Sequence, residues 1–128
     1  MKISEVSKHF SVSIQTLRYY ERIGVIPNIP RDTNGFRDYR KSDLYWIHYV
    51  QALRRSGVSI HSIQTYVGLV RQGATTRDER KAILLEQRRK LLEQRALIDD
   101  ALIHMDQKLS VYDEYVVALE ENTRPSDQ

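Results

Sequence analysis

The feature that most constrains this chain is a stretch of 44 residues, from Thr76 to Leu119, that contains neither glycine nor proline. An α-helix rises about 1.5 Å per residue, so a continuous helix of this length would span roughly 66 Å. Thr76 and Glu79 have the capping-box spacing of a helix N-terminus. A helix this long cannot be buried within the 75 residues that precede it. We therefore expect a small N-terminal domain over residues 1–75, followed by a long exposed helix.

An apolar seven-residue repeat runs along this predicted helix. It consists of Leu84, Leu91, Ile98, Met105 and Tyr112, and Leu102, Leu109 and Val116 fill the intervening positions of its second half. Arg88 and Arg95 occupy those positions in the first half. Such a repeat forms the seam of a coiled coil and needs a partner helix. The repeat predicts a dimerisation helix over residues 76–120, with a break near Ser110 as an alternative, and a disordered tail over residues 121–128.

Charge is divided unevenly between the two parts. Residues 1–75 hold eleven Lys and Arg against five Asp and Glu, a net charge of +6, whereas residues 76–128 carry −3. A basic first half is typical of a nucleic-acid binder with a separate segment for a partner. No run of about 18 apolar residues exists and the first residues lack a signal peptide's apolar stretch, so a cytoplasmic protein is expected.

No catalytic, metal or cofactor site is expected. The chain has no cysteine, which excludes disulfides, thiolate metal sites and a cysteine nucleophile. The histidines are scattered over four predicted helices without the spacing of metal ligands; they are His9, His48, His61 and His104. There is no glycine-rich phosphate loop and no strand-turn-helix nucleophile elbow. An enzyme is therefore not expected.

The N-terminal residues favour a helix-turn-helix. A short helix is expected over residues 4–10, capped by Ser4, with the turn at Ser11 and Val12. Ser13 is placed to cap the second helix. Polar side chains at the start of a second helix suit a recognition helix that reads base edges in the major groove. The predicted DNA contacts are Ser13, Gln15, Thr16, Arg18 and Tyr19. The alternative is an ordinary amphipathic helix with an exposed basic face.

A hairpin that faces DNA is expected over residues 27–39. Asn34-Gly35 is a strong hairpin signal because both residues tolerate the positive φ of a type I′ turn. Strand alternation assigns Phe36 and Asp38 to one face, and Arg37 and Tyr39 to the other. A hairpin with basic side chains can lie on phosphates as a wing. Its predicted contacts are Arg31, Phe36, Arg37 and Tyr39, with Arg40 at its end. The alternative is a solvated surface hairpin.

Two more helices complete the predicted domain. Ser42 is placed to cap a helix that runs to about Ser56, with a buried stripe of Leu44, Ile47, Val50 and Leu53. Ser59 is placed to cap a fourth helix in which Ile60, Ile63, Val67 and Val70 recur at helical spacing. The free N–H groups at its N-terminus suit a DNA phosphate, so Ser59 joins the predicted DNA contacts.

Several motifs in this order carry a family resemblance. They are Thr16-Leu17-Arg18-Tyr19-Tyr20-Glu21, Gly24-Val25-Ile26-Pro27, Arg31, Asn34-Gly35-Phe36-Arg37-Asp38-Tyr39 and Leu53-Arg54-Arg55-Ser56-Gly57-Val58-Ser59-Ile60. Over roughly residues 2–70 the chain resembles the MerR family of bacterial transcription regulators. It departs from that family at the helix-helix turn, where Ser11 replaces the usual Gly, and at Ser7, which replaces a common Ala.

The resemblance implies a mainly α fold, with a winged helix-turn-helix DNA-binding domain followed by a long dimerising coiled-coil helix. It implies antiparallel pairing with the same helix of a second subunit, a direction that the repeat itself leaves open. It also implies a homodimer that binds a near-palindromic operator inside a promoter with an overlong spacer, and that distorts the DNA for RNA polymerase. The alternatives are a plain repressor, an architectural or recombination accessory protein, and a scaffold coiled coil without a DNA role.

The resemblance leaves the effector open. The family's metal sensors use cysteines near the long helix, its drug sensors append a large C-terminal domain, and a short aldehyde-responsive subgroup has a cysteine where this chain has Ala52. This chain resembles the short subgroup without its thiol. The remaining hypothesis is a non-covalent effector pocket at Trp46 and Tyr49, walled by the partner's Tyr112 and the partner's Tyr115. The alternative is that these aromatic side chains only pack the dimer.

Overall fold

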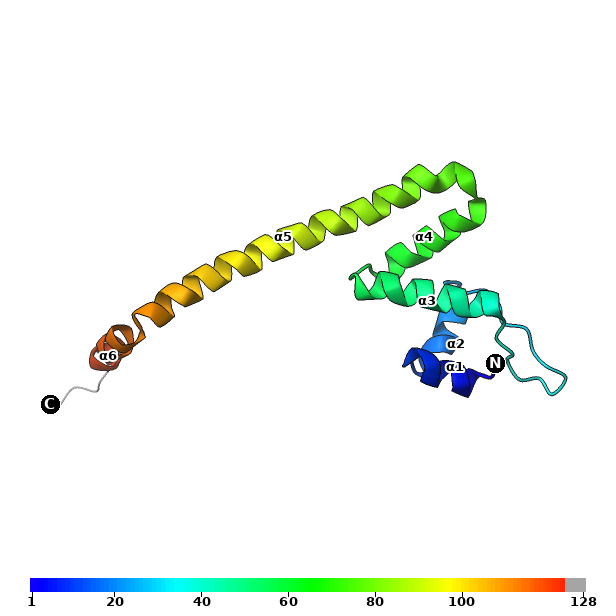
Figure 1. Cartoon of the computed structure of the whole chain (residues 1–128), viewed down its shortest axis with the longest axis horizontal. Helices are drawn as coiled ribbons and strands as arrows, with labels where there is room; N and C mark the ends of the chain where they lie inside the picture. Colours follow the sequence, from blue (N-terminus) through cyan, green and yellow to red (C-terminus); the bar gives the residue numbers. More distant parts are fainter. Residues whose placement is uncertain (124–128) are drawn as a thin grey trace. The chain divides into compact units, whose positions relative to one another are not determined.

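The computed structural model describes residues 1–123 and is mainly helical (Figure 1). Its elements are α1 (Ile3–Phe10), α2 (Ile14–Arg22), α3 (Lys41–Arg55), α4 (Ile60–Gln72), the short 3₁₀ helix η1 (Ala74–Thr76), α5 (Arg77–Ser110) and α6 (Tyr112–Thr123). The described residues form no extended strand, only two isolated β-bridges, Lys2 with Asp38 and Arg31 with Arg37. The predicted mainly α fold with a long C-terminal helix is confirmed.

The first compact unit runs from Met1 to Gln87. Within it, α3 contacts both α1 and α4, and α1 contacts α2. The fully buried core side chains come from all four of these helices and from the loops between them; they are Val6, Leu17, Val25, Ile26, Ile47, Val50, Ile63 and Val67. The predicted apolar stripes of α3 and α4 therefore do face the core.

This unit extends past the predicted boundary at residue 75 because the first turns of α5 pack against it. Ile83 contacts the core. Gln87 Nε2 donates a hydrogen bond of 2.7 Å to the carbonyl oxygen of Ser56, at the end of α3. Ile83 lies beside Leu84 but outside the seven-residue repeat, so the repeat did not reveal this contact.

Two predicted helix caps are confirmed. The Ser13 hydroxyl accepts a hydrogen bond of 3.0 Å from the Thr16 backbone N–H, and the Ser59 hydroxyl accepts one of 3.1 Å from the Ser62 backbone N–H. Each hydroxyl satisfies one of the N–H groups that the first turn leaves without a helical partner. These caps fix where α2 and α4 begin.

Three other predicted caps are wrong. α1 begins at Ile3 with Lys2 as its cap residue, so Ser4 lies inside the helix. α3 begins at Lys41, and the buried Asp43 carboxylate accepts the Arg40 backbone N–H at 2.8 Å in place of a Ser42 cap. The Thr76 hydroxyl donates to the Leu69 carbonyl oxygen at 2.6 Å and caps nothing. The start of α1 has no side-chain cap, whereas at α3 the Asp43 carboxylate binds the backbone of the cap residue Arg40.

The second unit begins at Arg88. α5 has no buried residue along its length and ends at Ser110, and α6 follows from Tyr112. Residues 121–123 are helical where the sequence predicted a disordered tail, since α6 runs to Thr123. Residues 124–128 of that predicted tail lie outside the described residues.

Candidate nucleic-acid interface

The turn between α1 and α2 sets the position of the predicted recognition helix. Ser11 closes α1 in the left-handed region, with φ of 53° and ψ of 46°. The Ser7 hydroxyl donates a hydrogen bond of 2.5 Å to the Val12 carbonyl oxygen. The two serines at which the sequence departs from the family resemblance therefore both belong to this turn. One supplies its backbone conformation and the other a hydrogen bond across it.

α2 presents one face to the core and one to solvent. Leu17 and Tyr20 are buried, whereas Arg18 and Tyr19 are exposed, as their predicted role as DNA contacts requires. An open groove of about 460 Å³ follows the exposed face; we call it the α2 groove. It is lined by Ser13, Gln15, Thr16, Arg18, Tyr19 and Arg22. All five residues predicted on the recognition helix thus share one surface.

Arg22 is the member of the α2 groove that the sequence reasoning missed. Its guanidinium carbon lies 5.2 Å from the centre of the Tyr19 ring, which is a cation–π distance. The two residues are three apart on a helix, and side chains at that spacing are neighbours. That spacing was the signal that could have identified Arg22.

A second groove, of about 370 Å³, lies between α1, α2 and the wing, which we define as residues 27–39. This wing groove is lined by Lys2, Ile3, Ser4, Arg18, Arg31, Phe36 and Arg37. Arg18 lines both grooves, so the exposed face of α2 continues into the wing. The start of α1 was not predicted at this surface. Its backbone N–H groups lack a side-chain cap and suit an anion.

The turn of the wing differs from the prediction. Gly35 has a φ of 82°, but Asn34 does not have a positive φ. The Asp32 carboxylate accepts the backbone N–H groups of Asn34 and Phe36 at 2.9 and 3.0 Å, and the Gly35 N–H donates to the Asp32 carbonyl oxygen at 3.0 Å. This three-residue turn begins at Asp32 and needs a positive φ at only one residue, Gly35, in place of a type I′ turn.

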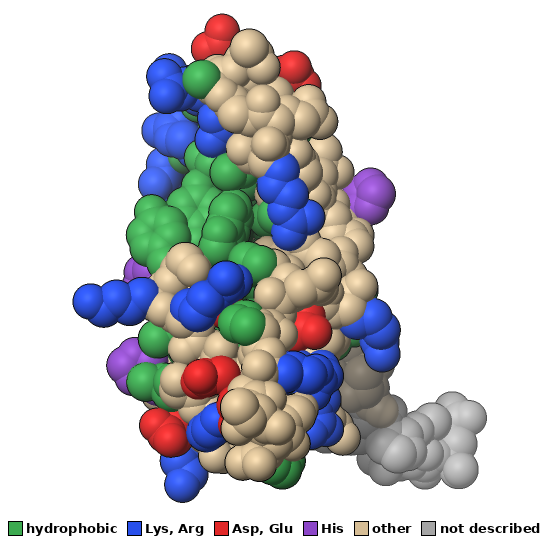
Figure 2. Space-filling model, turned by 90° about the vertical axis from the view of Figure 1, so that its right-hand side faces the viewer, with side chains coloured by type: hydrophobic (Ala, Val, Ile, Leu, Met, Phe, Trp, Pro, Cys, Tyr) green, Lys and Arg blue, Asp and Glu red, His purple; other side chains and the backbone are tan. Residues whose placement is uncertain are grey.

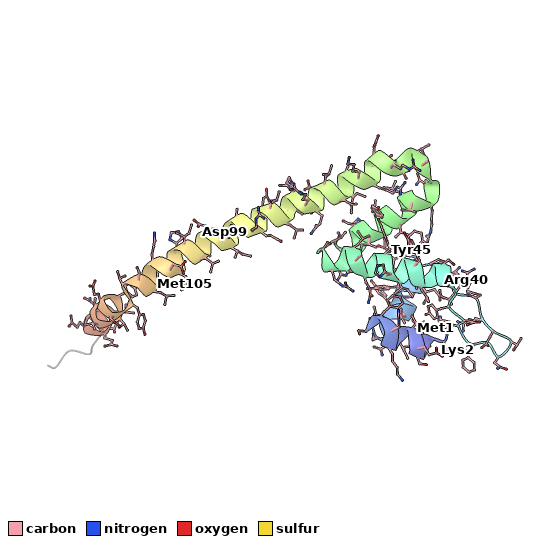
Figure 3. All side chains as sticks on the ribbon, in the orientation of Figure 1. Met1, Lys2, Arg40, Tyr45, Asp99 and Met105 are labelled. Atoms are coloured by element: carbon pink, nitrogen blue, oxygen red, sulfur yellow. The ribbon has the colours of Figure 1, made fainter. Side chains whose placement is uncertain are left out.

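The chain terminus holds the other end of the wing. The Met1 amino group forms an ion pair of 3.0 Å with Asp38, and the Tyr39 backbone N–H donates to the Met1 carbonyl oxygen at 2.8 Å. Lys2 forms an ion pair with Asp32, which raises the pKa of Lys2 and lowers that of Asp32. Met1 and Lys2 lie beside the wing in Figure 3. Their backbone and charges tie α1 to the wing.

Arg37 and Tyr39 point inward, and Phe36 and Asp38 point outward, as the predicted alternation requires. Arg37 Nε donates to Glu21 Oε1 at 3.0 Å, and both side chains are less than one-fifth exposed. The guanidinium therefore links the wing to α2. Phe36 is 66% exposed at the wing groove. Arg31 Nη1 donates to the Gly35 carbonyl oxygen at 2.8 Å and remains exposed.

Tyr39 is a correction. The sequence placed it among the DNA contacts, but it is only 3% exposed and belongs to the core. Its hydroxyl is buried and has no hydrogen-bond partner among the described residues. Burial raises the pKa of Tyr39, so the phenol stays neutral. Its ring fills the space under the wing because the alternation that exposes Phe36 must turn Tyr39 inward.

The remaining predicted positions lie apart from the two grooves. Ser59 caps α4 and lines neither groove. Trp46 and Tyr49 are half-buried and line a separate cavity together with Tyr66, which the sequence reasoning took only as part of a helix. The walls expected from the partner's Tyr112 and the partner's Tyr115 stay a prediction.

The comparisons with known proteins agree with this geometry. A family model described as MerR HTH family regulatory protein matches residues 1–68, which is more than half of the chain. The chain belongs to the MerR family. The match covers α1, α2, the wing, α3 and most of α4, so it includes both grooves.

Its similarity to individual MerR proteins extends beyond this domain. The HTH-type transcriptional regulator AdhR of Bacillus subtilis is 41% identical over 93 residues, which are 73% of this chain and 66% of that protein. A crystal structure assigned to a MerR family transcriptional regulator from Listeria monocytogenes is 37% identical, has a TM-score of 0.76, and the match covers 95% and 92% of the two chains.

A third similar protein was solved on DNA. HiNmlR, described as a MerR family regulator lacking the sensor domain and bound to promoter DNA, is 27% identical with a TM-score of 0.71. The match covers 91% of this chain and 92% of that one. These MerR proteins are transcriptional regulators, not enzymes.

Two further observations concern other classes of protein. Among residues 1–123, no group of three or more His, Asp or Glu side chains is arranged to hold a metal ion. The helices of the same residues include none with the length and hydropathy needed to cross a membrane.

Proposed function

We propose that this MerR protein is a homodimeric, sequence-specific regulator that binds a near-palindromic promoter operator and distorts it. DNA binding is assigned to residues 1–75 and dimerisation to residues 76–120. The observation that carries the proposal is the continuity of the α2 groove and the wing groove through Arg18, because one surface then joins base-reading and phosphate-binding side chains.

The two grooves support different kinds of DNA contact. Gln15, Thr16 and Arg18 near the start of α2 can donate to and accept from base edges in a major groove. Arg31 and the uncapped start of α1 can neutralise or bind phosphates. Arg37 contributes by holding the wing against α2, since its charge is already paired with Glu21. The remaining assigned contacts are Ser13, Tyr19, Phe36 and Ser59.

The exposed apolar repeat supports the homodimer. Every dimerisation residue predicted from the sequence is exposed in the single chain, between 38% at Leu84 and 62% at Leu109; the others are Leu91, Ile98, Leu102, Met105 and Tyr112. Exposed apolar stripes of this extent are typical of interaction surfaces. Two identical subunits related by a twofold axis would read the two halves of a near-palindrome.

The binding assignment is tested by selection from random-sequence duplex DNA with the full chain, followed by titration on the enriched sequence. We expect an inverted repeat to be enriched. Arg18→Ala should weaken binding to it by about fivefold or more, since a base-reading arginine contributes about 1 to 3 kcal/mol. Tyr19→Phe should weaken binding less. Arg77→Ala is the control, because this exposed arginine lies on α5 away from both grooves. Unchanged affinity in Arg18→Ala would contradict the recognition-helix assignment.

Distortion is tested by transcription in vitro with RNA polymerase. We expect the protein to activate a promoter that carries the selected operator in an overlong spacer, and not the same promoter with a spacer of ordinary length. Repression of both promoters would instead identify a plain repressor. Binding without any effect on transcription would favour an architectural role.

A further inference from the structure

A cavity of about 230 Å³ lies apart from the DNA-binding grooves, where α3, α4 and the start of α5 meet. It is lined by Tyr45, Trp46, Tyr49, Tyr66, Val70 and Arg80. All six residues belong to the first compact unit, so this aromatic cavity is complete within one chain. Its volume is below the roughly 300 to 1,000 Å³ of pockets for drug-sized ligands, which suits a compound with a single ring.

Aromatic faces form most of the wall. The rings of Tyr49 and Tyr66 are stacked, with centroids 5.8 Å apart, and the rings of Trp46 and Tyr49 meet edge to face at 6.4 Å. Offset and edge-to-face packing are the arrangements that a further planar ring can extend. A hydrophobic patch flanked by Lys and Arg side chains is visible on the face drawn in Figure 2. The lining therefore favours a planar aromatic ligand.

The polar groups of the cavity are hydrogen-bond donors. The hydroxyl oxygens of Tyr49 and Tyr66 lie 2.5 Å apart. Two hydroxyls carry two hydrogens and their mutual bond uses one, so the other has no acceptor among the described residues. Burial and the hydrogen bond with Tyr66 raise the pKa of Tyr49, which keeps it a neutral donor.

Arg80 adds a positive charge. Its Nε donates to the Thr76 hydroxyl at 3.1 Å and its Nη2 to the Gly73 carbonyl oxygen at 3.5 Å. Both acceptors are neutral, and the ion pairs among residues 1–123 include no carboxylate partner for Arg80. A guanidinium that is paired only with neutral oxygens is suited to receive a carboxylate.

We infer that the aromatic cavity binds a small planar aromatic carboxylate, with its ring against Trp46 and Tyr49 and its carboxylate at Arg80 and the tyrosine hydroxyls. Because Arg80 also holds Thr76 and Gly73, the ligand would contact the connection between α4 and α5. Occupancy would therefore change operator affinity by favouring one arrangement of this connection. That regulatory consequence rests on the proposed function, whereas the binding itself does not.

The binding is tested with benzoate as the probe and with the emission of Trp46, the single tryptophan of the chain. We expect a saturable change in emission in the full chain without DNA. Benzyl alcohol and benzylammonium, which have the same ring without the negative charge, should bind at least tenfold more weakly. This comparison uses only the wild-type protein. A change that does not saturate, or equal binding of the three compounds, would overturn the inference.

Variants test the residues. Arg80→Met should weaken benzoate binding at least tenfold, Arg80→Lys should weaken it less, and Tyr66→Phe should weaken it several-fold. Arg77→Met is the matched control, because it removes an exposed guanidinium from the same turn of α5 and should bind benzoate as the wild type does. Equal binding by folded Arg80→Met and wild type would overturn the assignment of the carboxylate to Arg80.

Operator titrations separate this inference from the proposed function. The protein could bind the selected operator in the absence of benzoate and yet show no saturable change in Trp46 emission when benzoate is added. That result would overturn the inferred ligand site and leave the proposed function as a regulator standing. A saturable benzoate signal in a protein that enriches no DNA sequence would overturn the proposed function and leave the ligand site standing. We expect both activities, with benzoate altering operator affinity in the wild type and not in Arg80→Met.

Discussion

Ser11 has a strained backbone conformation in the turn that positions α2. Its φ of 53° lies in the left-handed region, which side chains other than glycine adopt at a cost of about 1 to 2 kcal/mol. The MerR resemblance places Gly at this position. The Ser7 hydroxyl, bonded to the Val12 carbonyl oxygen, offsets part of this cost in the same turn.

Ser11→Gly is therefore expected to stabilise the first unit by about 0.5 to 1 kcal/mol, because relief of the backbone strain exceeds the extra entropy of glycine in the unfolded chain. Chemical unfolding followed by circular dichroism measures it. Ser11→Ala keeps the Cβ atom and should give no such gain. Equal stabilisation by both substitutions would show that the hydroxyl, and not the backbone, is the unfavourable feature.

The role of a single residue could be predicted where the local sequence offered only one side chain for that role. Ser13 and Ser59 were identified as caps because no other polar side chain competes for the same N–H groups. Ser42 was wrong because the helix begins earlier, at Lys41, where the buried Asp43 carboxylate accepts the backbone N–H of the cap residue Arg40. The partner of Tyr49 was not predictable, since contact with Tyr66 depends on how α3 packs on α4.

The wing is the element whose role the structure changes most. The sequence predicted Arg31 and Arg37 alike as phosphate contacts, but the structure gives the two side chains different surroundings. Arg31 is exposed, whereas Arg37 is paired with Glu21 on α2. Such a long-range ion pair cannot be read from a sequence pattern, because it depends on where the wing docks.

Salt dependence of operator binding separates these two arginines. Arg31→Ala should reduce the slope of log affinity against log salt by about one, since one phosphate contact is lost. Arg37→Ala should lower affinity on all sequences with little change in slope, because Glu21 already neutralises its charge. Titrations at several salt concentrations provide the slopes. A slope reduced by about one in Arg37→Ala would show that Arg37 leaves Glu21 for a phosphate.

At the scale of the whole molecule, the sequence predicted the long C-terminal helix better than the boundary of the compact unit that precedes it. Uninterrupted helical sequence and the seven-residue repeat identified α5 and its exposed apolar positions. The compact unit nevertheless continues to Gln87, because Ile83 packs against the core of the domain and Gln87 forms a hydrogen bond with Ser56. A repeat records the side chains that face a partner, and it cannot show which turns of the same helix also face the domain.

The dimer is what connects the two parts in the proposed function. Ile98→Asp and Leu102→Asp each place a carboxylate in the predicted seam, where burial without a partner costs on the order of several kcal/mol. Gln107→Asp is the matched control, since position 107 lies on the opposite side of the helix from the repeat. Figure 3 labels Asp99 and Met105, which lie on the same exposed stretch of α5 as these positions.

Light scattering on these proteins, together with titration of the selected operator, tests the central claim most directly. We predict a mass of about twice 15.1 kDa for the wild type and for Gln107→Asp, and of about 15.1 kDa for Ile98→Asp and Leu102→Asp. Operator binding should be lost in the two monomeric variants, because one reading domain cannot supply the affinity of two. A monomeric wild type, or intact dimers in both seam variants, would contradict this account.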